Sequence, residues 1–201
     1  TVRRIILILM KNTAIIIPTR LAAKRFPNKP LEKINNIPMI LHVLQRAKES
    51  KVGEVYVATP DDEIFQLVNE NGGIAILTKE NHSSGSDRIY EVYLKQLKNN
   101  VDLIINLQGD MPNIKPNNIA RLEKLMRDND CDIGTLASHI SSENINNPNV
   151  VKVKIDKELD ENNFVNAKDF FRKNTYSSSK KTYHHIGIYA FTNISLTKYV
   201  K

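Results

Sequence analysis

Four cationic side chains are grouped in the first segment of the sequence that could bind a charged ligand. Arg20, Lys24, Arg25 and Lys29 follow the apolar run 14–17, and prolines restrict the backbone around them. Lysine and arginine bind phosphate groups, and arginine can form paired hydrogen bonds with one of them. The segment has neither a Walker A pattern nor a glycine-rich dinucleotide loop. It therefore indicates a polyphosphate site built from side chains, or else a basic surface loop.

A carboxylate follows a second apolar run. Residues 103–107 lead directly into Gln108, Gly109 and Asp110. In nucleotide sites, Mg²⁺ is held by one or two carboxylates together with substrate phosphates. Asp110 is therefore a candidate magnesium ligand, although an aspartate after a glycine is also common in ordinary turns.

A third polar segment, residues 82–88, reads His-Ser-Ser-Gly-Ser-Asp-Arg. Serine and aspartate at this spacing could bind a ligand or only cap a helix. His184 and His185 open a later β-rich run, but no zinc-ligand spacing accompanies them. No Gly-x-Ser-x-Gly pattern occurs, and the single Cys131 has no evident partner histidine. A covalent enzyme intermediate is therefore not expected.

Short apolar runs alternate with amphipathic patterns, and these elements must position the three polar segments. Strands are expected at residues 14–17, 55–58, 74–77, 103–107, 133–137, 150–155 and 186–191. Helices are expected at residues 37–50, 62–71, 87–99 and 117–128. The alternation over the first five strands implies parallel pairing with helices on both faces. Ligands of such sheets bind at the carboxyl ends of the strands, where all three polar segments stand.

Composition suits a single soluble domain of 201 residues, with 41% hydrophobic and 25% charged side chains. The net charge of +7 suits nucleic acid or a phosphorylated small molecule. A nucleic-acid module would need a continuous basic patch with aromatic residues for stacking. The cations cluster after a strand instead, so no nucleic-acid partner is expected.

The apolar run at residues 5–10 follows two arginines, like the start of a secretory signal. It is shorter than the roughly 7–15 residues of a signal core and lacks a small-residue cleavage site. No stretch approaches the roughly 20 apolar residues of a membrane helix. We expect a cytoplasmic protein without membrane insertion. Residues 1–12 would form an N-terminal extension, with 1–9 lying upstream of a natural start at Met10.

Taken together and in order, these segments resemble the CMP-Kdo synthetases, also called 3-deoxy-manno-octulosonate cytidylyltransferases. The resemblance begins near Thr13, extends to the last residue, and rests on IIIPTRLAAKRFPNKPL, IPMILHVLQRAKES, VYVATPD, HSSGSDR, NLQGDMP, NPNVVKV and HIGIYAF. It implies an α/β, Rossmann-like nucleotidyltransferase fold over residues 13–201. Such a fold has a mostly parallel sheet with helices on both faces and a small β-containing lobe.

The resemblance also implies how the reaction proceeds. Arg20 and Lys29 would hold the phosphates of CTP, with Arg25 close by, and Asp110 would bind Mg²⁺. The anomeric hydroxyl of Kdo would attack the α-phosphorus of CTP, releasing pyrophosphate and giving CMP-Kdo for lipopolysaccharide biosynthesis. Catalysis of this kind depends on positioning and charge neutralisation, which agrees with the missing nucleophile.

Further residues are implied to recognise the two substrates. These are Lys79, Ser84, Gly85 and Ser86 for the cytosine end, and Gln108, Arg172, His185 and Tyr189 for the sugar. A homodimer is implied as well. The alternatives are a cytidylyltransferase for another acid sugar, such as sialic acid, and a non-catalytic or weakly active remnant of the family.

The sequence departs from the family pattern at several positions. Asn28 replaces a glycine, Met111 a frequent glutamate and Lys79 an arginine; asparagine tolerates positive φ better than most residues. The segment around Arg172 lacks the usual serine and Ile-Pro. The later Leu-Glu…Glu-Gln-Leu-Arg and Val-Asp-Thr motifs do not occur. We therefore expect a C-terminally incomplete domain that binds CTP weakly and turns over slowly or not at all.

Overall fold

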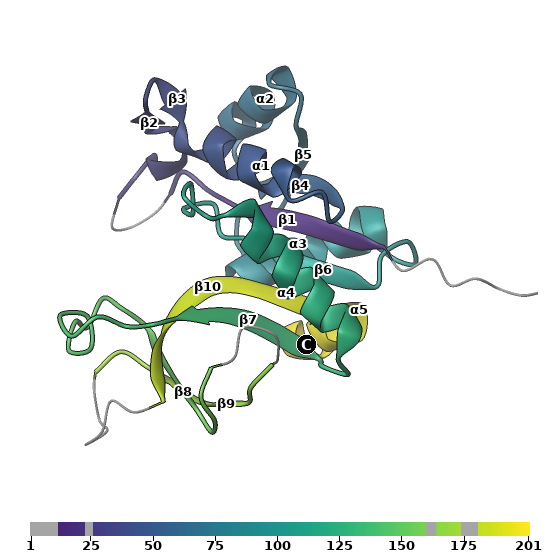
Figure 1. Ribbon diagram of the computed structural model, residues 1–201. Helices are drawn as coiled ribbons and strands as arrows, with labels where there is room; N and C mark the ends of the chain where they lie inside the picture. Colours follow the sequence, from purple (N-terminus) through teal and green to yellow (C-terminus); the bar gives the residue numbers. More distant parts are fainter. Residues whose placement is uncertain (1–11, 23–25, 160–163, 174–180) are drawn as a thin grey trace, which may run out of the picture.

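The computed structural model describes residues 12–22, 26–159, 164–173 and 181–201. Within these residues an eight-stranded sheet has the order β5-β4-β1-β6-β10-β8-β9, and β7 pairs with β10 (Figure 1). Its strands are β1 (Thr13–Pro18), β4 (Glu54–Thr59), β5 (Ile74–Leu77), β6 (Leu103–Asn106), β7 (Ile133–Ser138), β8 (Lys152–Ile155), β9 (Ala167–Phe171) and β10 (Thr182–Thr192). A separate small hairpin joins β2 (Lys33–Ile34) to β3 (Ile37–Pro38).

The first half of the sheet is parallel, as the alternation of elements predicted. β1 pairs in parallel with β4 on one edge and β6 on the other, and β4 pairs in parallel with β5. Ile15 and Ile17 belong to the core on one face of the sheet, whereas Ile16 belongs to the core on the other. All three side chains are fully buried, which is typical of a strand covered on both faces.

Helices cover both faces. The first core lies beneath α1 (Met39–Glu49), α2 (Asp62–Glu70) and α4 (Pro116–Asp128). The second lies beneath α3 (Gly85–Val92), its π-helical continuation η2 (Tyr93–Leu97), and α5 (Asn193–Val200). Residues 29–31 add a short 3₁₀ turn, η1 (Lys29–Leu31). Among the described helices, none combines the length and apolar character needed to cross a bilayer.

The prediction of parallel pairing was wrong for residues 133–137. This strand, β7, runs antiparallel to β10, which is also antiparallel to β6 and β8. The long strand β10 occupies the free edge of β6, so β7 can only join the opposite edge of β10. Strands β7 to β10 form the lower part of the molecule in Figure 1. They are the small β-containing lobe that the sequence predicted.

Three helices begin at other residues than predicted, α4 by a single residue because Pro116 is its first residue. Helix α1 begins at Met39 instead of residue 37, because Asn35 and Asn36 adopt left-handed conformations (φ 51° and 67°) and close the β2–β3 hairpin. Helix α3 begins two residues earlier than predicted. The Ser84 hydroxyl accepts from the Asp87 amide, and the Asp87 carboxylate accepts from the Ser84 amide.

Helix α5 starts with a comparable cap, from which a stability change follows. The Thr192 hydroxyl accepts a hydrogen bond of 3.1 Å from the Ser195 amide. We expect Thr192→Ala to lower the free energy of unfolding by about 1 kcal/mol in urea titrations, because that amide loses its partner. Thr192→Ser, which keeps the hydroxyl, should retain most of the stability. Equal losses in both variants would contradict this role of the hydroxyl.

Candidate functional site

The three polar segments predicted from the sequence meet at the carboxyl edge of the parallel strands. They follow β1, β5 and β6, and together they enclose a cavity of about 290 Å³. The cavity is lined by Pro18, Thr19, Arg20, His82, Ser83, Ser84, Gly85, Arg88 and Gln108. This is the position at which open α/β sheets bind ligands.

The segment after β1 is fixed by Asp61. Its carboxylate accepts a 2.8 Å hydrogen bond from the Leu21 amide. The Thr19 amide donates to the Ala58 carbonyl at 2.9 Å. Asp61 occupies the N-cap position of α2, but its side chain makes no capping hydrogen bond to that helix. It holds the basic segment against β4 instead, and so defines the course of the chain around Arg20.

A lysine and an aspartate form an ion pair near this cavity, although neither is among its lining residues. Asn28, which replaces a glycine of the family pattern, adopts a left-handed conformation (φ 57°), and Lys29 follows directly. The Lys29 Nζ lies 2.8 Å from Asp110 Oδ2, with side-chain exposures of 38% and 53%. Gly109 lets the segment after β6 pass close to the end of β1, since a Cβ there would lie 3.2 Å from the Pro18 carbonyl oxygen. An exposed pair contributes at most about 1 kcal/mol, so both charges are available to a ligand.

Asp110 is the carboxylate at this site that is suited to a divalent cation. Across the described part of the chain, no three or more His, Cys, Asp or Glu side chains are grouped as a metal site. A cation at Asp110 would therefore need phosphate or water oxygens as its other ligands. A hard carboxylate oxygen near a cationic cavity fits that requirement.

Arg88 is a cavity residue that the sequence analysis did not select. Its side chain is 3% exposed and donates to the Thr78 hydroxyl and to the carbonyls of Lys79 (2.9 Å) and Glu80 (3.3 Å). Burial, and to a smaller extent the charge of Arg20, lowers the pKa of its guanidinium. The sequence feature that could have indicated Arg88 was its position next to Ile89, on the face of α3 that is buried.

The predicted base-recognition residues are only partly brought to the cavity. Ser84 and Gly85 line it, whereas Lys79 and Ser86 are not among its lining residues. The Ser84 hydroxyl is also engaged in capping α3. Arg25 lies outside the described residues, and so do residues 1–11 of the expected extension 1–12.

Gln108 links the cavity to the antiparallel lobe. A Cβ on Gly187 of β10 would lie 3.9 Å from the Gln108 side chain. Next to this position, Tyr189 of β10 pairs in register with Asn106 of β6. The Gln108 amide donates to the Asn106 side chain at 3.0 Å. The side chain predicted to contact the sugar therefore lies between the two halves of the sheet.

His185 and Tyr189 form an aromatic wall on the lobe. Their rings lie 5.3 Å apart, and Phe170 of β9 meets the His185 ring edge-on at 4.9 Å. Burial, followed by the charge of His184, lowers the pKa of His185 to about 4. Its Nε2 lies 2.9 Å from the Thr135 hydroxyl, whose proton is directed to the Ile188 carbonyl at 2.6 Å. The imidazole therefore donates through Nε2 and is neutral at physiological pH.

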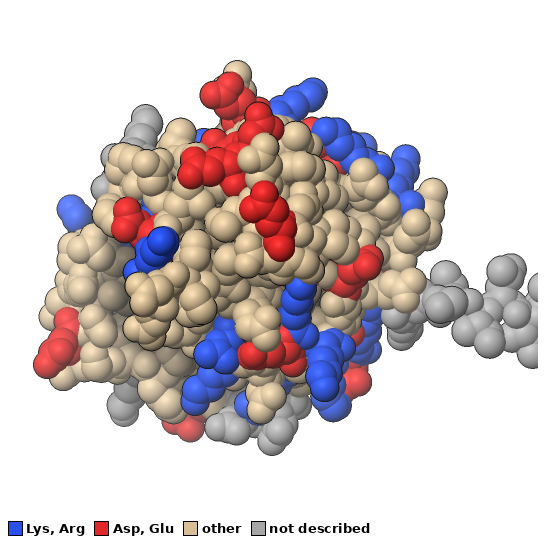
Figure 2. Space-filling model, turned by 90° about the horizontal axis from the view of Figure 1, so that it is seen from above, with Lys and Arg blue, Asp and Glu red and all other residues tan. Residues whose placement is uncertain are grey.

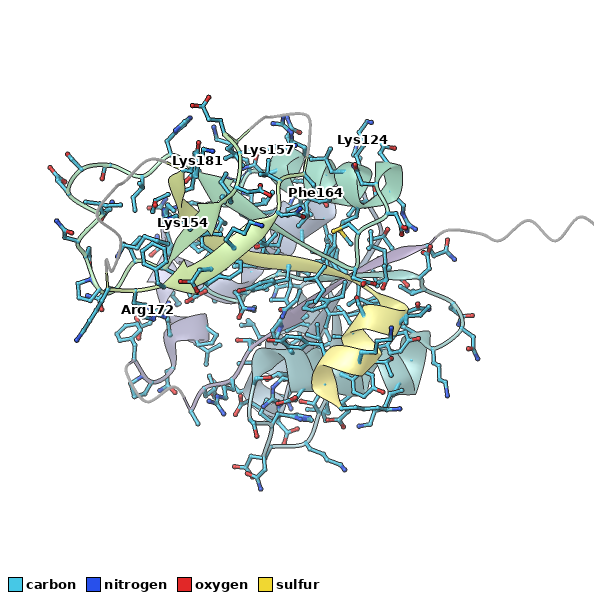
Figure 3. The ribbon with its side chains drawn as sticks, turned by 90° about the horizontal axis from the view of Figure 1, so that it is seen from below. Lys124, Lys154, Lys157, Phe164, Arg172 and Lys181 are labelled. Atoms are coloured by element: carbon cyan, nitrogen blue, oxygen red, sulfur yellow. The ribbon has the colours of Figure 1, made fainter. Side chains whose placement is uncertain are left out.

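Arg172 is exposed beyond the end of β9. In the view from below it lies at the end of the lobe remote from α5 (Figure 3). Its guanidinium donates to the Asn149 carbonyl at 3.1 Å, and its own carbonyl accepts from Lys152 at 2.6 Å. Lys152 is completely buried and also donates to the Asn147 carbonyl at 2.6 Å. This lysine therefore ties the Arg172 segment to the loop before β8.

The net positive charge is not gathered into one surface on the face seen from above. Separate groups of acidic and basic side chains cover that face (Figure 2). Seen from below, Lys124, Lys157 and Lys181 are spread over the lobe and α4 (Figure 3). The cations of the cavity are thus a local feature of the β1 segment and of α3.

A parallel sheet with cations after one strand and a carboxylate after its neighbour defines a nucleotide-binding α/β protein. The sequence profile described as cytidylyltransferase matches residues 14–201. The chain belongs to this cytidylyltransferase family, as the resemblance of its motifs predicted.

Individual relatives agree with this assignment. The 3-deoxy-manno-octulosonate cytidylyltransferases of Brucella canis and Brucella anthropi are each 42% identical over 191 residues, which is 94% of this chain and 76% of theirs. A solved CMP:2-keto-3-deoxy-manno-octonic acid synthetase complexed with CTP has a TM-score of 0.83 and 38% identity, covering 94% of this chain and 77% of the other. A 4-diphosphocytidyl-2C-methyl-D-erythritol synthase from Anaerococcus prevotii shares the fold, with a TM-score of 0.61 and 14% identity over 94% of this chain and 77% of its own.

The buried state of His185 predicts how stability depends on pH. Its pKa in the folded state, about 4, lies below the ordinary value of 6.5, so the unfolded chain takes up the proton first as pH falls. Stability is therefore complete above the ordinary value and decreases below it. From about pH 7 to pH 5 we expect this residue to remove about 1–2 kcal/mol from the free energy of unfolding.

Urea titrations at the two pH values measure this effect. His185→Gln should show a smaller loss than the original chain, because the other four histidines are common to both proteins. Equal losses in the two proteins would show that His185 is not protonated preferentially in the unfolded state.

Proposed function

We propose that the chain transfers the cytidylyl group of CTP to Kdo, giving CMP-Kdo and pyrophosphate for lipopolysaccharide biosynthesis. Membership of the cytidylyltransferase family and the similarity to named Kdo cytidylyltransferases support this function. The observation that carries it is the pairing of Lys29 with Asp110, which follows the cavity residue Gln108, near a cavity lined by Arg20. A triphosphate requires a cationic side chain for its phosphates, and its bound metal requires a carboxylate.

The proposed reaction needs no nucleophile from the protein. The anomeric hydroxyl of Kdo loses its proton, and its oxygen forms a bond to the α-phosphorus of CTP. The bond from that phosphorus to the bridging oxygen breaks, and pyrophosphate leaves with the electron pair. Arg20 and Lys29 would neutralise the charge that accumulates on the phosphate oxygens, with Arg25 assigned to the same group. Positioning and electrostatic stabilisation of this kind supply the rate enhancement.

Mg²⁺ is the divalent cation we propose, with Asp110 as its protein ligand. When bound, it would supply positive charge to the phosphate oxygens. The exposed Asp110 carboxylate must release Lys29 to bind it, and the low energy of an exposed pair permits this exchange.

The lobe is proposed to bind the sugar. The guanidinium of Arg172 suits the carboxylate of an acid sugar, because it can donate two parallel hydrogen bonds. Gln108, His185 and Tyr189 offer hydrogen bonds to hydroxyl groups from the junction and the aromatic wall. Lys79 and Ser86 remain assigned to the cytosine end with Ser84 and Gly85. A cytoplasmic homodimer is part of the same proposal.

Pyrophosphate release from CTP and MgCl₂ tests the function directly. We expect release that depends on added Kdo and is not supported to the same extent by sialic acid. Release supported equally by sialic acid would transfer the assignment to another acid sugar. Absence of release with either sugar would contradict the proposed transferase activity.

Asp110→Asn tests the assigned carboxylate. We expect kcat to fall at least about a hundredfold with little change in the free energy of unfolding, because several kcal/mol of charge stabilisation are lost. Glu63→Gln, a matched change at an exposed position of α2, should leave kcat unchanged. A kcat for Asp110→Asn within a fewfold of the original would exclude Asp110 as the metal ligand.

A further inference from the structure

The loop between β5 and α3 is held from inside by a buried carboxylate. Glu91 of α3 has a side-chain exposure of 10%. Its Oε2 accepts from the Lys79 amide at 3.0 Å and lies 2.5 Å from His82 Nε2. Its Oε1 lies 2.5 Å from the Lys95 ammonium. One carboxylate therefore joins the start of this loop to the imidazole near its end.

The ionisation of Glu91 determines which nitrogen of His82 carries a proton. Burial alone would raise the pKa of Glu91, but contacts with Lys95, His82 and the Lys79 amide outweigh it and bring the pKa to about 2. An ionised carboxylate can only accept hydrogen bonds. His82 Nε2 must therefore donate to Glu91. In the neutral imidazole this leaves Nδ1 as a hydrogen-bond acceptor.

The His82 ring is placed where a ligand can reach it. It is one of the residues that line the cavity, although its side chain is only 15% exposed. The carbonyls of Lys79 and Glu80 are occupied by Arg88, and the His82 amide donates to Glu80 at 3.0 Å. The loop is thus tied from α3 at several points. A neutral ring held in this way keeps Nδ1 as its one acceptor, on a side chain that lines the cavity.

An acceptor at this position distinguishes the two pyrimidine bases. Cytosine carries an exocyclic amino group that donates a hydrogen bond, whereas the corresponding oxygen of uracil only accepts. Two acceptors facing each other leave both without a partner, and unpaired buried polar groups reduce binding strongly. We propose that His82, positioned by Glu91, selects cytosine over uracil in the nucleotide. This inference rests on the proposed use of the cavity by a cytidine nucleotide.

Steady-state kinetics with CTP and UTP test the inference, at a pH of about 8.5, well above the ordinary pKa of a histidine side chain. We expect His82→Ala to lower the ratio of kcat/KM for CTP to that for UTP by about tenfold or more, the effect of one lost discriminating hydrogen bond. Glu91→Gln should lower the same ratio, because its amide no longer dictates the imidazole tautomer. The double variant should resemble His82→Ala alone, since Glu91 acts through the ring.

Lys95→Met is the matched control. It removes the partner of the other Glu91 oxygen, at an exposed side chain, and leaves the contacts with His82 and Lys79 in place. Its CTP-to-UTP ratio should equal that of the original chain. If His82→Ala and Glu91→Gln reduce activity with both nucleotides equally, the pair only stabilises the loop and the inference is wrong.

Titration calorimetry separates this inference from the proposed function. Affinity for CTP and UTP can be measured without turnover. A chain that binds CTP more tightly than UTP, and loses this preference in His82→Ala, supports the inference even if no sugar accepts the cytidylyl group. Equal affinity of the original chain for the two nucleotides overturns the inference whatever the activity.

Discussion

The complete burial of β1 is the constraint on which the site depends. With Ile15, Ile16 and Ile17 inaccessible to water, its backbone groups must pair with β4 and β6, and its two faces must be covered by helices. These requirements fix the point at which the chain leaves the sheet at Pro18. They also bring the segments after β5 and β6 to the same edge. The cavity is thus a product of strand order rather than of any single loop.

The parallel half was predictable because its signals are local. Four apolar runs separated by amphipathic helices specify β1, β4, β5 and β6, and residues 74–77 were predicted with the observed bounds. The lobe was less predictable. β9 reads Ala-Lys-Asp-Phe-Phe and is largely exposed, so it shows no alternation of buried and exposed residues, and the partner of β7 lies about fifty residues further along the chain. Contacts so distant in sequence leave no local pattern.

The site was predictable to the extent that its charges are exposed. Arg20, Lys29 and Asp110 stand in polar segments after strands, where function is ordinarily sought. Arg88 and Glu91 lie within an apparently ordinary amphipathic helix, and only the fold shows that they face inward. Lys152 is similar, because it is completely buried in β8 and donates to two backbone carbonyls. These buried charges shape the β5–α3 loop and the segment of Arg172.

Before any ligand binds, the charges of Lys29 and Asp110 neutralise each other near the cavity. An anion without a metal that bound Lys29 would leave Asp110 without its ion-pair partner. A free metal ion at Asp110 would leave Lys29 without its partner. A metal–triphosphate complex carries both positive and negative charge. Its phosphates can bind Lys29 while its metal binds Asp110. Under the proposed function, a metal–triphosphate complex therefore satisfies both members of the pair in one binding event, whereas inorganic phosphate or free metal satisfies only one of them.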